Sequence, residues 1–135
     1  MKRLILYDLD GTLVDTAEDI TEAVNHMLAH VGHPPLPRQE VLRFVGRGLH
    51  ELIQRCLQID DPQMVARGID AYAAYYTEHL LDHSRLYPSA QEVLEYFKDR
   101  TQAVVTNKPN PYSQDILTGL GVADYFHEII AGEDG

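Results

Sequence analysis

Two acidic side chains stand two residues apart near the start of the chain, in the segment Asp8-Leu9-Asp10-Gly11-Thr12. Side chains two apart along an extended backbone point to the same side, so Asp8 and Asp10 can face one ligand. Two carboxylates this close repel each other unless a cation or a shared proton lies between them. Because Mg²⁺ favours oxygen ligands and usually binds together with substrate phosphates, the pair predicts a magnesium site. The alternative is a solvated turn after a strand.

A second polar cluster, Thr106-Asn107-Lys108, follows an apolar stretch later in the chain. On its own it is also typical of a strand end or a helix cap. The chemistry therefore depends on whether the fold brings the two clusters together.

Hydrophobic patterning places both clusters at the ends of predicted strands. A strand is expected at residues 3–7, and after Arg3 its residues 4–7 are continuously apolar, which is typical of a strand covered on both faces. Further strands are expected at 102–106 and 128–131. Helices at 89–98 and 111–120 alternate with these strands, which favours parallel pairing. Ligands of open α/β sheets bind beyond the carboxyl ends of the strands, where both clusters would lie.

The segment between the first two strands has helical periodicity instead. A helix begins at Asp15 or Thr16, Gly32 can close it, and its apolar positions are Ile20, Val24, Met27, Leu28 and Val31. Further helices are expected over 38–45 with Pro37 at the first position, over 49–57, and from Asp61-Pro62 to about residue 80. We therefore predict an α/β protein with a partial Rossmann-like parallel sheet, formed by residues 1–15 and 85–135, and an inserted helical domain at 16–84.

Composition narrows the class of protein. The chain has 135 residues and a formal charge of −10, and 44% of its residues are hydrophobic, which indicates a packed core. The acidic balance argues against nucleic-acid binding, because phosphate contacts need clustered Lys and Arg. No apolar run is long enough for a membrane helix. With Cys56 as the single cysteine, an internal disulfide is excluded and the cytoplasm is the expected compartment.

Taken together, an apolar strand, the string Asp-Leu-Asp-Gly-Thr-Leu-Val-Asp-Thr and a capped helix resemble the first motif of the haloacid dehalogenase (HAD) superfamily. The helical insertion resembles the helical cap of that family, and Val104-Val105-Thr106-Asn107-Lys108-Pro109 resembles its second motif. Gly46-Arg47-Gly48 in the cap and Ala131-Gly132-Glu133-Asp134 most resemble the phosphoglycolate phosphatase branch. The resemblance implies Mg²⁺-dependent hydrolysis of a small phosphorylated metabolite through an aspartyl-phosphate.

The resemblance also implies roles for individual residues. Asp8 would be the nucleophile, and Asp10 would protonate the leaving group and then activate water. The Asp8 carboxylate and the Asp10 carbonyl would hold Mg²⁺. The Thr106 hydroxyl and the N–H groups of Leu9, Asp10 and Asn107 would bind phosphate.

Three further residues are candidate substrate contacts. Arg47 offers a planar fork for a carboxylate or phosphate, although an exposed turn is an equal alternative. Lys108 could reach substrate at the cap interface or face solvent. Thr12 either contacts substrate or fixes the turn after Asp10.

The acidic motif and the lysine that complete the family's site are absent from the 135 residues. Little or no activity is therefore expected of this chain alone. The alternatives are a phosphomutase of the same superfamily and a truncated, inactive α/β module. In either case residues 3–7 would form an apolar edge strand, which invites self-association through the open edge.

Overall fold

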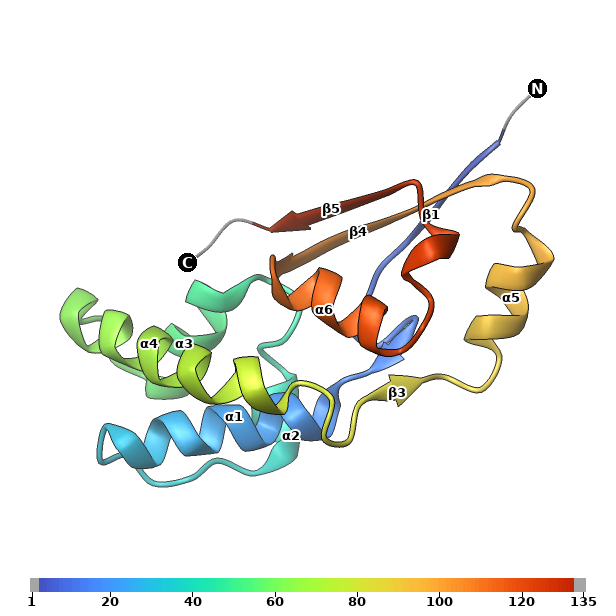
Figure 1. The fold of residues 1–135 in the computed structure, drawn as a ribbon. Coiled ribbons are helices and arrows are strands. Elements are labelled where there is room, and N and C mark those ends of the chain that lie inside the picture. The colour runs from blue at the N-terminus through green and yellow to red at the C-terminus, as the bar shows by residue number, and fades with distance from the viewer. Residues whose placement is uncertain (1–2, 133–135) are drawn as a thin grey trace.

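The computed structural model describes residues 3–132, and within them a three-stranded parallel sheet lies beside a group of helices (Figure 1). The strand order is β1 (Leu4–Tyr7), β4 (Thr101–Pro109), β5 (Glu128–Gly132), with β4 in the centre. The predicted α/β class with a partial parallel sheet is confirmed. β4 continues beyond the expected end at residue 106, so the Thr106-Asn107-Lys108 cluster lies within the strand. Its pairing with β5 is irregular between Val105 and Pro109.

The two faces of this sheet differ. Helices α5 (Ala90–Tyr96) and α6 (Tyr112–Gly119) lie on one face (Figure 1). Alternation along the strands and the register of Leu6 with Ala103 and Val105 with Ile130 place a row of apolar side chains on the other face. The exposed fractions there are 60% for Leu4, 57% for Leu6, 41% for Val105 and 47% for Ile130. The expectation that β1 is covered on both faces is therefore wrong for the described residues, because no described element packs against this side.

Four helices form the segment between β1 and β4. They are α1 (Ala17–His30), α2 (Arg38–Leu42), α3 (Leu49–Leu57) and α4 (Pro62–His79). α4 begins where expected, because the Asp61 side chain accepts the N–H of Gln63 at 3.0 Å. α2 ends three residues earlier than predicted, and Pro37 precedes its first residue. The division of the chain into two domains at 15/16 and 84/85 stays a prediction.

The helices pack closely because small residues allow it. α4 contacts α1 and α3, and Gly68 lies at the point of contact. A Cβ atom added at Gly68 would lie 2.8 Å from Ile53 Cγ2 and 3.3 Å from Met27 Sδ. Ile53 and Met27 are both fully buried. The absence of a side chain on Gly68 therefore sets the distance between these helices.

The two segments that connect the helices to the sheet pair with each other. β2 (Val14–Asp15) runs antiparallel to β3 (Arg85–Leu86), with Val14 opposite Leu86. Both strands have only two residues, too few for a periodic signal, and the sequence did not predict them. The short 3₁₀ helix at Ala123–Tyr125 was also not predicted.

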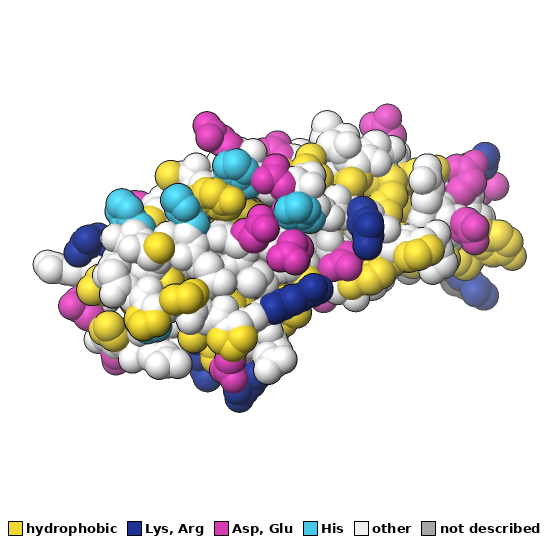
Figure 2. Space-filling model, turned by 90° about the horizontal axis from the view of Figure 1, so that it is seen from below, with side chains coloured by type: hydrophobic (Ala, Val, Ile, Leu, Met, Phe, Trp, Pro, Cys, Tyr) yellow, Lys and Arg dark blue, Asp and Glu magenta, His cyan; other side chains and the backbone are white. Residues whose placement is uncertain are grey.

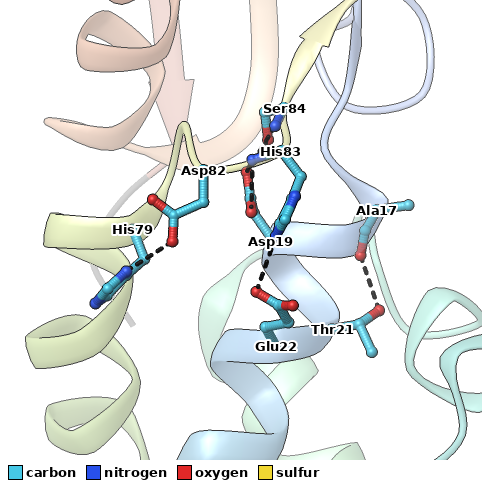
Figure 3. A network of polar contacts seen from close by, with 8 residues as sticks. All are labelled: Ala17, Asp19, Thr21, Glu22, His79, Asp82, His83 and Ser84. Carbon is cyan, nitrogen blue, oxygen red and sulfur yellow. Dashed lines mark hydrogen bonds and ion pairs between the residues drawn. The ribbon is translucent and has the colours of Figure 1, made fainter.

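Asp19 fastens the second of these connecting segments to α1 (Figure 3). Its buried carboxylate accepts hydrogen bonds from the N–H of His83 at 2.9 Å, the N–H of Ser84 at 2.7 Å and Ser84 Oγ at 2.7 Å. Glu22 lies beside it, 3.5 Å from His83 Nε2. The chain thus returns from α4 to the sheet across the first turns of α1.

The surface shows no continuous basic patch on the face in Figure 2, where Asp, Glu and His side chains gather and single Lys or Arg side chains lie among them. Across residues 3–132, every helix is too short or too polar to span a lipid bilayer.

Candidate active site

The first cluster lies on the turn that follows β1. Asp8 is exposed, and its Oδ1 accepts the N–H of Leu9 at 2.7 Å. Leu9 is fully buried, and its carbonyl oxygen accepts the N–H groups of Leu13 and Val14, both at 3.1 Å. Gly11 has a φ of +80°, a conformation that a residue with a side chain rarely adopts. Burial of Leu9 and the turn at Gly11 together hold Asp8 at the carboxyl end of the strand.

Asp10 is held more firmly than Asp8. Its side chain is 12% exposed, and its Oδ1 accepts a hydrogen bond of 2.7 Å from Thr16 Oγ1. The ammonium of Lys108 lies 3.5 Å from the same oxygen. The sequence suggested Thr16 as a helix cap. The structure instead shows no capping bond from its side chain, and Asp15 Oδ1 accepts the N–H of Ala17 at 3.3 Å.

The second cluster approaches the first from β4. Thr106 is buried, and its Oγ1 accepts the N–H of Lys108 at 3.1 Å. This bond uses a lone pair of Thr106 and not its hydroxyl proton. Asn107 is exposed, and its Nδ2 donates to the carbonyl oxygen of Gly46 at 2.7 Å. Asn107 therefore joins the sheet to the loop between α2 and α3.

Both clusters line one pocket of about 190 Å³ between the sheet and the helices. Its polar wall contains Asp8, Asp10, Thr106, Asn107 and Lys108. Its other side is largely apolar and comes from the helical segment and the loop before α3: Ile20, Val45, Gly46, Gly48, Leu49, Leu52 and Tyr72. The pocket can therefore hold a charged group at one end and cover it with apolar side chains at the other.

Lys108 contacts one of three clustered tyrosines, and none of the three was expected at the site from the sequence. Lys108 Nζ donates to Tyr76 Oη at 2.9 Å and lies 4.6 Å from the centre of its ring. Tyr72 and Tyr112 each have a ring centroid 5.1 Å from that of Tyr76. Burial raises the pKa of the Tyr72 and Tyr76 phenols well above their ordinary value, so both stay neutral. The spacing of Tyr72 and Tyr76 along α4 is typical of a buried helical face, but it does not indicate what they contact.

Two of the candidate substrate contacts lie outside the residues that line the pocket. Arg47 is exposed, and its Nη1 lies 3.7 Å from Glu51 Oε1, although Gly46 and Gly48 on either side of it line the pocket. Thr12 is exposed on the turn, where its N–H donates to the Leu9 carbonyl at 3.3 Å. Their roles toward substrate stay predictions.

Two groups of residues have the chemistry of metal ligands. Asp8 and Asp10 both line the pocket, and the oxygen donors of such residues fit Mg²⁺ because this ion keeps several waters and binds few protein groups. Asp19, Glu22 and His83 form a separate group whose ligand atoms all lie within 4.8 Å of one another (Figure 3). The carboxylate of Asp19 is already engaged by the connecting segment, and this group lies outside the pocket.

The fold and the pocket define a class of protein. Residues 5–135 match the haloacid dehalogenase-like hydrolase family, and the chain belongs to that family. The resemblance seen in the first and second motifs is thereby confirmed.

Three similar proteins all bear the name phosphoglycolate phosphatase. The phosphoglycolate phosphatase of Haemophilus influenzae is 37% identical over 141 residues, which cover 97% of this chain and 63% of that protein. That of Thiobacillus denitrificans is 34% identical, covering 97% of this chain and 61% of its own length. A crystal structure of a predicted phosphoglycolate phosphatase from Haemophilus somnus superposes with a TM-score of 0.91 at 34% identity, covering 98% of this chain and 63% of that one. The chain thus spans somewhat less than two thirds of the length of these relatives.

Proposed function

We propose that this chain carries the nucleophile and the acid–base group of a phosphomonoester hydrolase, which acts on a small phosphorylated metabolite through an aspartyl-phosphate. One observation carries the proposal: Asp8, Asp10 and Thr106 line a single pocket at the carboxyl ends of β1 and β4. Phosphoglycolate is the first substrate to test, because the curated relatives bear the name phosphoglycolate phosphatase.

Asp8 has the position expected of a nucleophile. Its Oδ1 accepts the Leu9 N–H, so Oδ2 is the oxygen that we assign to attack phosphorus. The new Asp8 O–P bond forms as the bond from phosphorus to the substrate oxygen breaks. Asp10 gives its proton to that leaving oxygen, which departs as an alcohol.

The second half of the reaction restores both carboxyl groups. Water attacks the phosphorus of the aspartyl-phosphate while Asp10 takes its proton, and phosphate leaves with the Asp8 O–P bond broken. Thr106 Oγ1 donates its free proton to a phosphate oxygen, and the main-chain N–H groups of Asp10 and Asn107 complete the binding site, joined by that of Leu9 when it turns from Asp8 Oδ1 to the phosphate. When bound by Asp8 and the Asp10 carbonyl, Mg²⁺ would offset repulsion between the carboxylates and the phosphate.

The test traps the aspartyl-phosphate, which a single phosphoryl transfer forms, so it does not depend on the turnover that this chain alone is expected to lack. The chain is mixed with Mg²⁺ and p-nitrophenyl phosphate, then quenched in acid, and the phosphoryl group is located by mass spectrometry. We expect it on Asp8, and none in the Asp8→Asn variant. Asp99→Asn is the matched control, because Asp99 is exposed and lies outside the pocket. Phosphorylation of the Asp8→Asn variant at the wild-type level would refute the assignment of the nucleophile.

We also propose that the open face of the sheet supports self-association. It combines the edge of β1, which has no partner strand within residues 3–132, with the apolar side chains of Leu4, Leu6, Val105 and Ile130. Parallel sheets are normally covered on both faces, so this surface favours contact with further apolar surface.

A further inference from the structure

Lys108 places a positive charge at the wall of the pocket, where its burial is energetically unfavourable. Its side chain is only 7% exposed, and a buried ammonium is unfavourable unless it is paired and hydrogen-bonded. The structure gives it two partners: Tyr76 Oη at 2.9 Å and Asp10 Oδ1 at 3.5 Å. Of the described residues that line the pocket, Lys108 alone carries a positive charge.

The main chain of Lys108 is fixed as well. Its N–H donates to Thr106 Oγ1 at 3.1 Å, and its carbonyl oxygen accepts a bond of 2.7 Å from Ser113 Oγ. These contacts set where the side chain starts. A lysine side chain has four rotatable bonds, so they do not determine where the ammonium ends.

Tyr76 determines the end of the side chain. It is fully buried on α4, and its ring packs against those of Tyr72 and Tyr112, which restricts where its hydroxyl can lie. That hydroxyl accepts the bond from Lys108, and the centre of the ring lies 4.6 Å from the ammonium, within the range of a cation–π contact. Hydroxyl and ring together leave the ammonium beside Asp10 at the wall of the pocket.

We propose that Tyr76 is a positioning residue that holds the Lys108 ammonium where it meets the anionic phosphoryl group of the substrate. This inference rests on the proposed function, because it takes the pocket to be the phosphate site. It gives the helical segment an electrostatic role: α4 places the positive charge that offsets the carboxylates of Asp8 and Asp10. When a phosphate oxygen enters between Asp10 and Lys108, it replaces the Asp10 carboxylate as the anionic partner of the ammonium.

The experiment follows the lysine side chains by NMR. The chain has three lysines, Lys2, Lys98 and Lys108, so selective ¹³C and ¹⁵N labelling gives few signals. Lys98→Arg and Lys2→Arg assign them. We expect the ε-methylene protons of Lys108 to be shifted upfield by the Tyr76 ring, and its Nζ–H signal to be protected from exchange with water. Tyr76→Phe should remove the protection, and Tyr76→Leu should also remove the upfield shift.

Binding of inorganic phosphate in the presence of Mg²⁺, followed by calorimetry, tests the consequence. Tyr76→Phe should weaken phosphate binding about three- to tenfold, the loss expected for one hydrogen bond. Lys108→Met should weaken phosphate binding more. Lys98→Met, which alters an exposed lysine, should leave phosphate binding unchanged.

A Tyr76→Phe variant that binds phosphate as tightly as wild type, or a wild-type Lys108 signal without ring shift and protection, would overturn the inference. No phosphate binding by the wild-type chain would contradict the proposed function itself. The two failures are distinct, because the lysine spectrum is recorded before phosphate is added.

Discussion

Thr16 Oγ1 donates a hydrogen bond of 2.7 Å to Asp10 Oδ1. Thr16 is buried at the start of α1, six residues after the acid that it contacts. The bond occupies one carboxylate oxygen of Asp10 and leaves Oδ2 to exchange protons with substrate and water. Rotation of the Asp10 side chain is therefore restricted from the helical side of the site.

Thr16→Val tests this contact, since valine keeps the shape and removes the hydroxyl. With p-nitrophenyl phosphate the leaving group needs little protonation, so the loss should appear in the second step, where Asp10 takes a proton from water. We expect the aspartyl-phosphate on Asp8 to persist roughly tenfold longer, measured by quench and mass spectrometry. Thr21→Val is the control, because Thr21 Oγ1 bonds to the Ala17 carbonyl and not to Asp10. An unchanged lifetime in Thr16→Val would show that the bond does not orient Asp10.

Asp19→Ala should destabilise the fold. The substitution leaves the N–H groups of His83 and Ser84 and the Ser84 hydroxyl without their acceptor in a buried place. Buried donors without partners cost about 1–3 kcal/mol, and we expect a loss of about 2–3 kcal/mol in the free energy of unfolding, measured with urea. Glu22→Ala, on the exposed side of the same cluster, should change it by less than about 0.5 kcal/mol. Equal effects of the two variants would contradict the anchoring role of Asp19.

Gly132→Ala should disturb the phosphate site from outside the pocket. A Cβ atom at Gly132 would overlap the carbonyl oxygen of Asn107, so the backbone of that residue must shift. We expect phosphate affinity in the presence of Mg²⁺ to fall at least about tenfold, because main-chain donors bind phosphate only when aligned. In Gly119→Ala the added methyl group meets the flexible end of the Leu81 side chain instead, and affinity should be kept. Wild-type affinity in Gly132→Ala would mean that the position of Asn107 does not matter for binding.

Cys56 should not react with thiol reagents in the native protein. It is fully buried, and burial raises the pKa of its thiol to about 12. At pH 8 about one molecule in ten thousand would then carry the reactive thiolate. Iodoacetamide should label the native chain far more slowly than the chain in urea, as read by mass spectrometry. Because the pKa lies above the assay range, raising the pH from 7 to 9 should leave the native thiol largely protonated, and rapid labelling at pH 8 would contradict its burial.

Leu4→Gln together with Leu6→Gln should reduce self-association. These side chains are 60% and 57% exposed on β1, the edge strand of the described sheet, where apolar edges favour contact between chains. We expect the double variant to sediment as a smaller species than wild type at the same concentration. Ile59→Gln is the control, since Ile59 is 41% exposed away from the sheet. If wild type and the double variant sediment alike as monomers, the proposed association is wrong.

How much of the site the sequence could predict depends on how far apart in the sequence the interacting residues lie. Asp8, Asp10 and Thr106 were expected to meet because parallel strands present their carboxyl ends at one edge, and the structure places all three in one pocket. The spacing of Tyr76 on α4 is typical of a buried position, but periodicity indicates which side of a helix is covered and not what covers it. Lys108 was left between solvent and substrate for the same reason, since its partner is 32 residues away.

The antiparallel pair formed by β2 and β3 has a consequence for folding. Leu4 pairs with Thr101, so closing the sheet joins residues almost a hundred positions apart, and the entropic cost of a loop grows with its length. The helices between them contact mainly one another, and once they are packed, Val14 and Asp15 lie beside Leu86 and Arg85. The loop that must then be closed consists only of the segments between β1 and β2 and between β3 and β4. The sequence separation of β1 and β4 thus overstates the entropic cost of pairing these strands, because the helical segment folds first and brings them closer together.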